Sequence, residues 1–167
     1  MMISCVIMGV SGSGKSSIGA AFAARIGAEF VDGDDLHLAA NIAKMAAGIP
    51  LTDGDRGPWL AAVGQTFLDR DQPLIVACSA LKSSYRTIIR SHARRQVIFL
   101  HLEGSRDVIA ARMGAREGHF MPTELLDSQF AALEAFDVDE RAVRVDIDQT
   151  PDEILAELVA HFEKDRL

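Results

Sequence analysis

The stretch of sequence that decides the fold is Gly9-Val10-Ser11-Gly12-Ser13-Gly14-Lys15-Ser16. The apolar run Ile3–Met8 precedes it, and a segment of helical character, Lys15–Ile26, follows it and stops at Gly27. A strand, a glycine-rich turn and a helix in this order match the whole pattern G-x-x-x-x-G-K-S, in which backbone N–H groups surround phosphate at a helix N-terminus. The sequence therefore predicts a site for ATP and Mg²⁺.

Within this loop each residue type has an expected role. The glycines let the backbone fold around an anion, Lys15 reaches the β- and γ-phosphates, and the Ser16 hydroxyl ligates Mg²⁺. The predicted nucleotide-binding residues are Gly9, Ser11, Gly12, Ser13, Gly14, Lys15, Ser16 and Ser17. Asp32, at the end of the next apolar run, is the predicted second Mg²⁺ ligand, with Asp146 and Asp148 as alternatives.

Strand-like and helix-like segments alternate along the rest of the chain. Further strands are expected at Ala28–Asp32, Pro73–Ser79, Gln96–Leu102 and Ala142–Ile147. Helices are expected at Leu36–Ala47, Lys82–Ala93, Ser105–Gly114, Thr123–Phe136 and Pro151–Phe162, with another that has Pro58 in its first turn and ends near Asp69. Five apolar strands separated by helices predict an α/β fold, in which a parallel sheet is covered on both faces.

Length and composition restrict the function classes. The chain has 167 residues, so residues 1–167 are expected to form one domain, with a lid near 114–122, where two glycines and a proline break the helical pattern. A net charge of −7 disfavours nucleic acid as the partner. Neither a signal core nor a membrane span is recognisable, and the cysteines, Cys5 and Cys78, lie in apolar runs. These features predict a cytoplasmic protein with a small-molecule substrate.

An acidic turn, Asp32-Gly33-Asp34-Asp35, directly follows the second predicted strand. Two carboxylates at alternate positions can have different roles. One can hold the metal while the other accepts a proton from an acceptor hydroxyl. We expect Asp32 to serve the metal and Asp34 to act at the acceptor, although the sequence leaves open which carboxylate takes the proton.

Several stretches resemble the gluconate kinases, small P-loop kinases related to the shikimate kinases. The resemblance covers nearly the whole chain and is most specific at Asp55-Arg56-Gly57-Pro58-Trp59 and Cys78-Ser79-Ala80-Leu81-Lys82, with Arg116-Glu117-Gly118-His119-Phe120 also similar. It implies a three-layer P-loop kinase fold with strand order 2-3-1-4-5, conversion of ATP and D-gluconate to 6-phosphogluconate and ADP, and often a homodimer. Leu38 stands where the family pattern has proline, so the second helix can begin differently.

A sugar acid bound to an acidic protein needs local cations. Arg56, Lys82 and Arg86 are the expected carboxylate-binding residues, and His37 is expected to contact a polyol. On the lid, Arg112 and Arg116 are expected to stabilise the transferring phosphoryl group, and His119 is a further substrate-binding residue.

Other functions remain open at this point. The chain could be a kinase for another small hydroxy acid such as shikimate, a nucleoside monophosphate kinase, or a non-catalytic ATP-binding module. The last of these predicts ATP binding without acceptor-dependent turnover.

Overall fold

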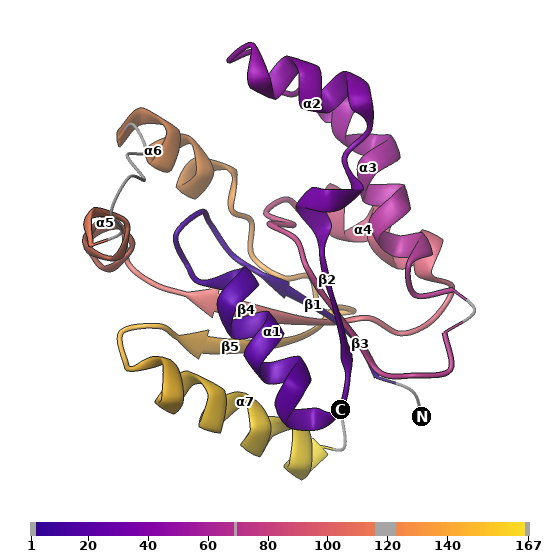
Figure 1. Ribbon diagram of the computed structural model, residues 1–167, viewed down its shortest axis with the longest axis vertical. Coiled ribbons are helices and arrows are strands. Elements are labelled where there is room, and N and C mark those ends of the chain that lie inside the picture. The colour runs from indigo at the N-terminus through magenta and orange to yellow at the C-terminus, as the bar shows by residue number, and fades with distance from the viewer. Residues whose placement is uncertain (1–2, 69, 116–122, 166–167) are drawn as a thin grey trace.

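The computed structural model describes residues 3–68, 70–115 and 123–165. Its centre is a sheet of five parallel strands in the order β2-β3-β1-β4-β5 (Figure 1). The strands are β1 Ser4–Met8, β2 Glu29–Asp32, β3 Leu74–Ala77, β4 Ile98–Glu103 and β5 Arg141–Asp146. The α/β class and the strand order predicted from the sequence are both confirmed.

The helices lie close to their predicted positions, with two informative differences. They are α1 Lys15–Ile26, α2 Ala39–Ala46, α3 Asp53–Gln65, α4 Ser83–Ala93, α5 Arg106–Gly114, α6 Thr123–Ala132 and α7 Pro151–Asp165, and a 3₁₀ helix, η1, spans Gly33–Leu36. The expected start near Pro58 is wrong for α3, because Thr52 and Asp55 form a capping box that begins the helix five residues earlier, at Asp53. The chain before α2 is occupied by η1, which Asp32 caps by accepting a hydrogen bond from the Asp34 N–H.

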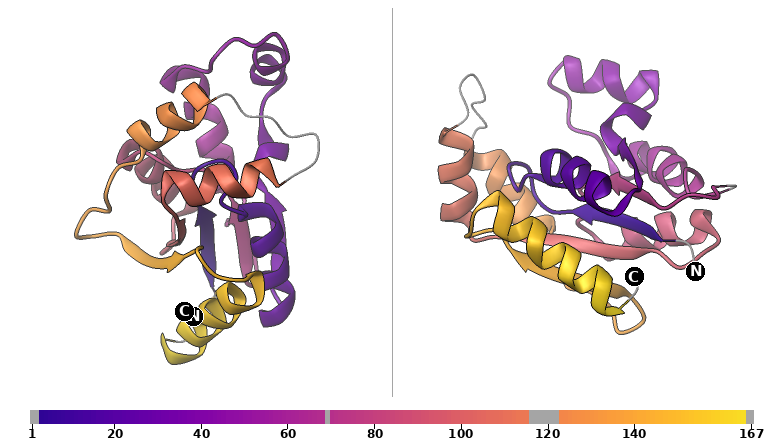
Figure 2. Two further views of the ribbon diagram at one scale, coloured as in Figure 1. Left: turned by 90° about the vertical axis from the view of Figure 1, so that its left-hand side faces the viewer. Right: turned by 60° about the horizontal axis from the view of Figure 1, so that its bottom comes forward.

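The two faces of the sheet are covered by different helices (Figures 1 and 2). Side chains of α1 and α7 pack on one face, where Ile7, Ile75 and Leu100 point. Helices α3 and α4 pack on the other face, against Val6, Val76 and Phe99. Successive residues of a strand point to opposite faces, so strands buried on both sides read as unbroken apolar runs.

The register of the strands brings three loops together at one edge of the sheet. Ile7 of β1 and Asp32 of β2 both pair with Ala77 of β3. The chain segments that follow these residues therefore emerge side by side at the carboxyl edge, where open parallel sheets bind ligands.

Helix α2 projects from the body of the molecule (Figure 1). Lys44 forms an ion pair with Asp55 at 2.8 Å, which ties α2 to the start of α3. Exposed apolar side chains gather in this region: Ile42 and Met45 are on α2, Leu38 directly precedes it, and Ile49 follows its end. We call these four residues the α2 stripe.

The expected lid falls mostly on residues 116–122, outside the described part of the chain, and it stays a prediction. None of the described helices has the length and apolar character needed to cross a membrane.

Candidate functional site

The phosphate loop lies between β1 and α1. Gly14, with φ of 92°, forms the N-cap of α1, and Gly12 has φ of 81°, so both positions require the left-handed backbone that glycine adopts without strain. A glycine at the cap has no side chain to bond the first N–H groups of the helix, which leaves them available to an anion. The Lys15 ammonium stands at the same place, and it donates to the carbonyl of Val10 at 3.0 Å.

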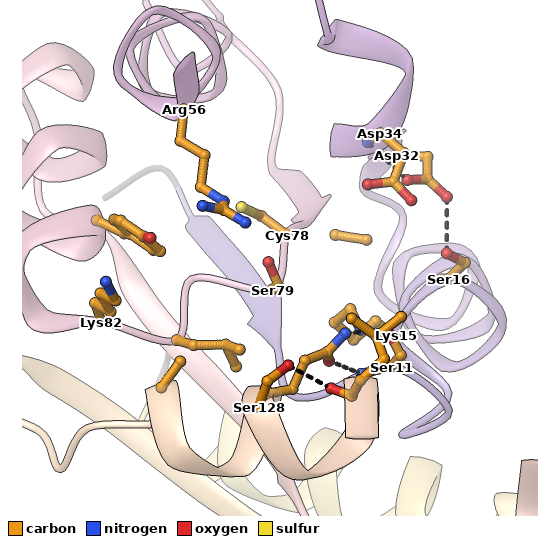
Figure 3. Close-up of a pocket in the computed structure, with 16 residues that line it drawn as sticks. Ser11, Lys15, Ser16, Asp32, Asp34, Arg56, Cys78, Ser79, Lys82 and Ser128 are labelled. Atoms are coloured by element: carbon orange, nitrogen blue, oxygen red, sulfur yellow. Dashed lines mark hydrogen bonds between the residues drawn. The ribbon is translucent and has the colours of Figure 1, made fainter. Parts of the chain in front are cut away.

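Two oxygen ligands suited to Mg²⁺ meet beside this loop. The Ser16 hydroxyl donates to Asp32 Oδ2 at 2.7 Å, while Asp32 Oδ1 accepts from the Asp34 N–H at 3.0 Å (Figure 3). Mg²⁺ is held by few protein oxygens when nucleotide phosphates and water complete its octahedron. A hydroxyl and a carboxylate at this distance therefore fit the ion.

The acidic turn is fixed against the sheet by a close backbone approach. A Cβ added at Gly33 would lie 2.3 Å from the carbonyl oxygen of Ala77, so only glycine fits there. The carbonyl of Gly33 also accepts a hydrogen bond from Trp59 Nε1 at 2.7 Å. Because Gly33 is held from both sides, the flanking carboxylates of Asp32 and Asp34 have a defined place at the pocket wall.

A pocket of about 330 Å³ lies in front of the phosphate loop (Figure 3). It is lined by Ser11, Lys15 and Ser16, by Asp32 and Asp34 of the acidic turn, by Arg56, Lys82 and Tyr85, and by Leu125, Ser128 and Gln129 of α6. The pocket thus joins the phosphate loop and the acidic turn to two of the predicted carboxylate-binding cations.

These two cations already surround a carboxylate of the protein. Lys82 lies 3.2 Å from Asp53, whose carboxylate also accepts from the Tyr85 hydroxyl, and Arg56 lies 3.9 Å from it. The bonds from Tyr85 and Lys82 lower the pKa of Asp53, and the bond to Asp53 raises the pKa of Lys82. The wall formed by Arg56, Lys82 and Tyr85 can therefore bind a carboxylate.

Arg86 requires a correction, since it is fully buried and does not line the pocket. Its Nε and Nη2 donate to the two carboxylate oxygens of Glu140 at 2.8 and 3.0 Å. The same guanidinium donates to the carbonyl of Leu81 at 3.1 Å and lies 4.7 Å from the centroid of the Phe136 ring. With its hydrogen-bonding capacity used inside the protein, Arg86 is a structural residue and not a substrate ligand.

His37 is stacked on Trp59, with ring centroids 4.2 Å apart and planes inclined by 15°. Burial lowers the pKa of His37, and its Nδ1 is buried without a hydrogen-bond partner in the described structure. The ring is not among the residues that line the pocket, so the geometry gives no contact to support its predicted role. Trp59, with its indole N–H bonded to Gly33, belongs to the core.

Arg112 lies beside the phosphate loop. Its Nη2 donates to the carbonyls of Ile147 and Gln149, and its Nη1 lies 3.9 Å from the position of a Cβ on Gly14. A second, more open pocket between Arg112 and the loop after β5 continues from there. Arg112 is therefore adjacent to the phosphate loop, whereas Arg116 and His119 lie outside the described residues.

Three polar residues that line the pocket, Ser79, Ser128 and Gln129, were not among the predicted site residues. Gln129 of α6 exchanges two hydrogen bonds with Ser11, although 118 residues separate them. The available signal was a glutamine between the apolar positions Leu126, Phe130 and Leu133 of a helix that directly follows the expected lid. A polar side chain on an inward-facing part of a helix needs a partner.

Comparisons with known proteins agree with this geometry. A family model described as "AAA domain" matches residues 5–136. The gluconokinase of Gluconobacter oxydans strain 621H is 44% identical over 161 residues, covering 95% of this chain and 90% of that protein. The thermosensitive gluconokinase of Escherichia coli K12 is 49% identical over 148 residues, covering 86% and 79%.

Solved structures of gluconokinases and related kinases have a similar fold. The crystal structure of a gluconokinase from Sinorhizobium meliloti 1021 aligns with a TM-score of 0.88 at 49% identity, covering 97% of this chain and 92% of that one. The shikimate kinase of Aquifex aeolicus, at 13% identity, aligns with a TM-score of 0.61 over 98% of both chains, and this likeness concerns the fold alone.

Proposed function

The chain belongs to the gluconokinase family, and we propose that it transfers the γ-phosphoryl group of ATP to D-gluconate, giving 6-phospho-D-gluconate and ADP. The observation that carries this proposal is one pocket that is lined by Arg56 and Lys82, by Asp34 and by residues of the phosphate loop. A sugar acid can place its carboxylate at the cations and its far hydroxyl at the phosphate loop.

The nucleotide is bound by the loop and by the cleft beside it. The N-terminus of α1 and the Lys15 ammonium hold the phosphates, and the nucleoside extends along Arg112 toward the loop after β5. Ser16 and Asp32 would hold Mg²⁺, which would supply positive charge to offset the charge of the phosphates.

Asp34 acts on the acceptor. It lies two residues beyond Asp32 on the pocket wall, where its carboxylate can accept a hydrogen bond from the hydroxyl that attacks phosphorus. As the new P–O bond forms and the bond to ADP breaks, the hydroxyl proton passes to Asp34. Because transfer to phosphorus depends mainly on positioning and charge, Asp34 orients the hydroxyl as well as taking its proton.

The test is ADP release measured with gluconate, glucose and shikimate as separate acceptors. We expect gluconate to stimulate turnover and glucose, which lacks the carboxylate, to stimulate little. Lys15→Ala, which removes the main cation at the β- and γ-phosphates, should abolish the gluconate-dependent rate in a folded protein. Equal rates with glucose and gluconate would contradict carboxylate recognition, and ATP binding without acceptor-dependent release would indicate a binding module.

We also propose a homodimer in the cytoplasm. The α2 stripe is the candidate interface, since a twofold contact places the same patch of both copies face to face and an apolar stripe is complementary to itself. Both cysteines are free and buried, which suits a reducing compartment.

A further inference from the structure

Gln129 connects helix α6 to the phosphate loop through two hydrogen bonds with one residue, Ser11. The Ser11 N–H donates to Gln129 Oε1 at 2.7 Å, and Gln129 Nε2 donates to Ser11 Oγ at 2.9 Å. The two bonds use both ends of one amide group, and they are drawn in Figure 3 at the base of the pocket. Such a two-point contact fixes the direction of the glutamine side chain as well as its distance from the loop.

The contact matters because α6 forms a wall of the acceptor pocket. Leu125, Ser128 and Ala132 of this helix line the pocket together with Gln129. Leu125 is 47% exposed and is the most apolar part of this wall. The position of α6 relative to the phosphate loop therefore sets the width of the pocket at the point where phosphoryl transfer occurs.

Few other polar contacts hold this helix in the described structure. On the opposite side of α6, Asp127 accepts a hydrogen bond from Arg106 of α5, and both side chains are substantially exposed. Leu126 is buried in the core and anchors the helix axis. Among the described residues, the Gln129–Ser11 pair is the hydrogen-bonded link between α6 and the phosphate loop.

We propose that Gln129 is a positioning residue that ties the α6 wall to Ser11 and so closes the acceptor side of the pocket against water during phosphoryl transfer. The assignment rests on the proposed function. Water is a competing acceptor of the γ-phosphoryl group, and a wall held at a fixed distance from the loop leaves room for the sugar acid and not for bulk water. Gln129 acts through Ser11 and α6 and is not required to touch the reacting atoms.

The first experiment measures transfer and hydrolysis separately. Gln129→Ala removes both bonds, so kcat/KM for gluconate should fall about 30-fold, equivalent to about 2 kcal/mol at 1.4 kcal/mol per tenfold change. The ratio of acceptor-independent ATP hydrolysis to gluconate phosphorylation should rise at least about tenfold. Affinity for ADP should change less than about threefold, because the Lys15 ammonium and the N-terminus of α1, which hold the phosphates, are unchanged.

A double-mutant cycle shows whether the two residues act together. Ser11→Ala removes the hydroxyl acceptor alone and should cause a smaller loss, and the double variant should lose no more than Gln129→Ala. Asp127→Ala is the matched control, because it also removes a contact of α6 but on the side away from the pocket. It should leave the ratio of hydrolysis to transfer unchanged.

A second readout does not depend on activity. In the nucleotide-free protein, exchange of the Ser11 amide proton followed by NMR should be slow in the wild type and at least about tenfold faster in Gln129→Ala. The proposal is overturned if Gln129→Ala keeps the wild-type ratio of hydrolysis to transfer, or if Asp127→Ala raises that ratio equally. It is also overturned if the losses in the double-mutant cycle are additive, or if exchange of the Ser11 amide proton is unchanged in Gln129→Ala. Absence of gluconate turnover in the wild type contradicts the proposed function. The exchange measurement then still shows whether Gln129 fixes α6 to Ser11.

Discussion

At the scale of single residues, the acidic turn carries two carboxylates with different surroundings. Asp32 is engaged on both oxygens, by the Ser16 hydroxyl and by the Asp34 N–H. Asp34 lines the pocket beside it, and a glycine that cannot be replaced separates the two. These different surroundings motivate the proposal that each carboxylate has a distinct task.

We predict that Asp34→Asn lowers kcat by roughly 10²–10⁴, the usual range for a positioned acid–base group, and leaves ATP-analogue binding nearly unchanged. Asp32→Asn should instead raise the Mg²⁺ requirement, with part of the rate recovered at high metal. Magnesium titrations of turnover on both variants make the comparison. Rescue of Asp34→Asn by magnesium, without rescue of Asp32→Asn, would show that the two assignments are reversed.

The cations show what a sequence can and cannot specify about single residues. Arg56 and Lys82 were placed at the acceptor from the need for charge beside a sugar acid, and both line the pocket. Arg86, four residues after Lys82, was assigned the same role, but its partner Glu140 is 54 residues away in sequence. In a sequence, an arginine that forms a buried ion pair cannot be distinguished from one that binds a substrate until its partner is known.

At the scale of elements, Arg86 determines how the turn between β3 and α4 is held. Ala80 in this turn has φ of 47°, a left-handed conformation that costs an L-residue about 1–2 kcal/mol. Arg86 donates to the carbonyls of Ala80 and Leu81, directly before Lys82. The buried ion pair with Glu140 therefore supports the placement of Lys82, the proposed substrate-binding cation.

We predict that Arg86→Met destabilises the protein by about 3–5 kcal/mol, because it leaves the Glu140 carboxylate buried without a counter-charge. Arg86→Met with Glu140→Leu should recover most of that stability, since apolar side chains of similar volume can replace a buried pair. The KM for gluconate should stay raised in the double variant, because the turn before Lys82 still lacks its hydrogen bonds. Denaturant unfolding and gluconate kinetics measure the two effects, and a normal KM in the double variant would contradict the link to Lys82.

The start of α3 gives a prediction on acid stability. Hydrogen bonds from Lys44, and then from the Thr52 N–H, lower the pKa of Asp55 from 3.8 to about 2. The unfolded chain therefore binds more protons between these values, so the stabilisation is complete above pH 3.8 and is lost as pH falls toward 2. The stability difference between wild type and Asp55→Asn should be constant near neutral pH and vanish near pH 2.

Urea unfolding midpoints between pH 2 and 7 measure this difference. Asp71→Asn, in an exposed loop before β3, is the control and should match the wild type throughout. A difference for Asp55→Asn that persists unchanged at pH 2 would show that the carboxylate charge is not the cause.

At the scale of the whole molecule, the sheet was predictable and the arrangement of its outer helices was less so. Five apolar runs separated by helices predicted a parallel sheet, because helices connect parallel strands and cover both faces of such a sheet. The start of α3 was not recovered because Pro58 was read as a first-turn residue, while the capping box lies upstream at Thr52. The Gln129–Ser11 contact joins positions 118 residues apart, and no local pattern encodes such a pairing.

The last prediction concerns assembly through the α2 stripe. Ile42 is 53% exposed at its centre, and a twofold contact buries it twice. Since burying one such side chain contributes about 1.5–3 kcal/mol, Ile42→Asp should weaken the dimer at least about 100-fold. Sedimentation velocity at micromolar concentration should show a dimer for the wild type and a monomer for the variant.

Val138→Asp is the control, because Val138 is fully exposed in the loop before β5 and lies outside the stripe, so this variant should remain dimeric. A monomeric wild type, or a dimer unaffected by Ile42→Asp, would show that the stripe does not join two copies.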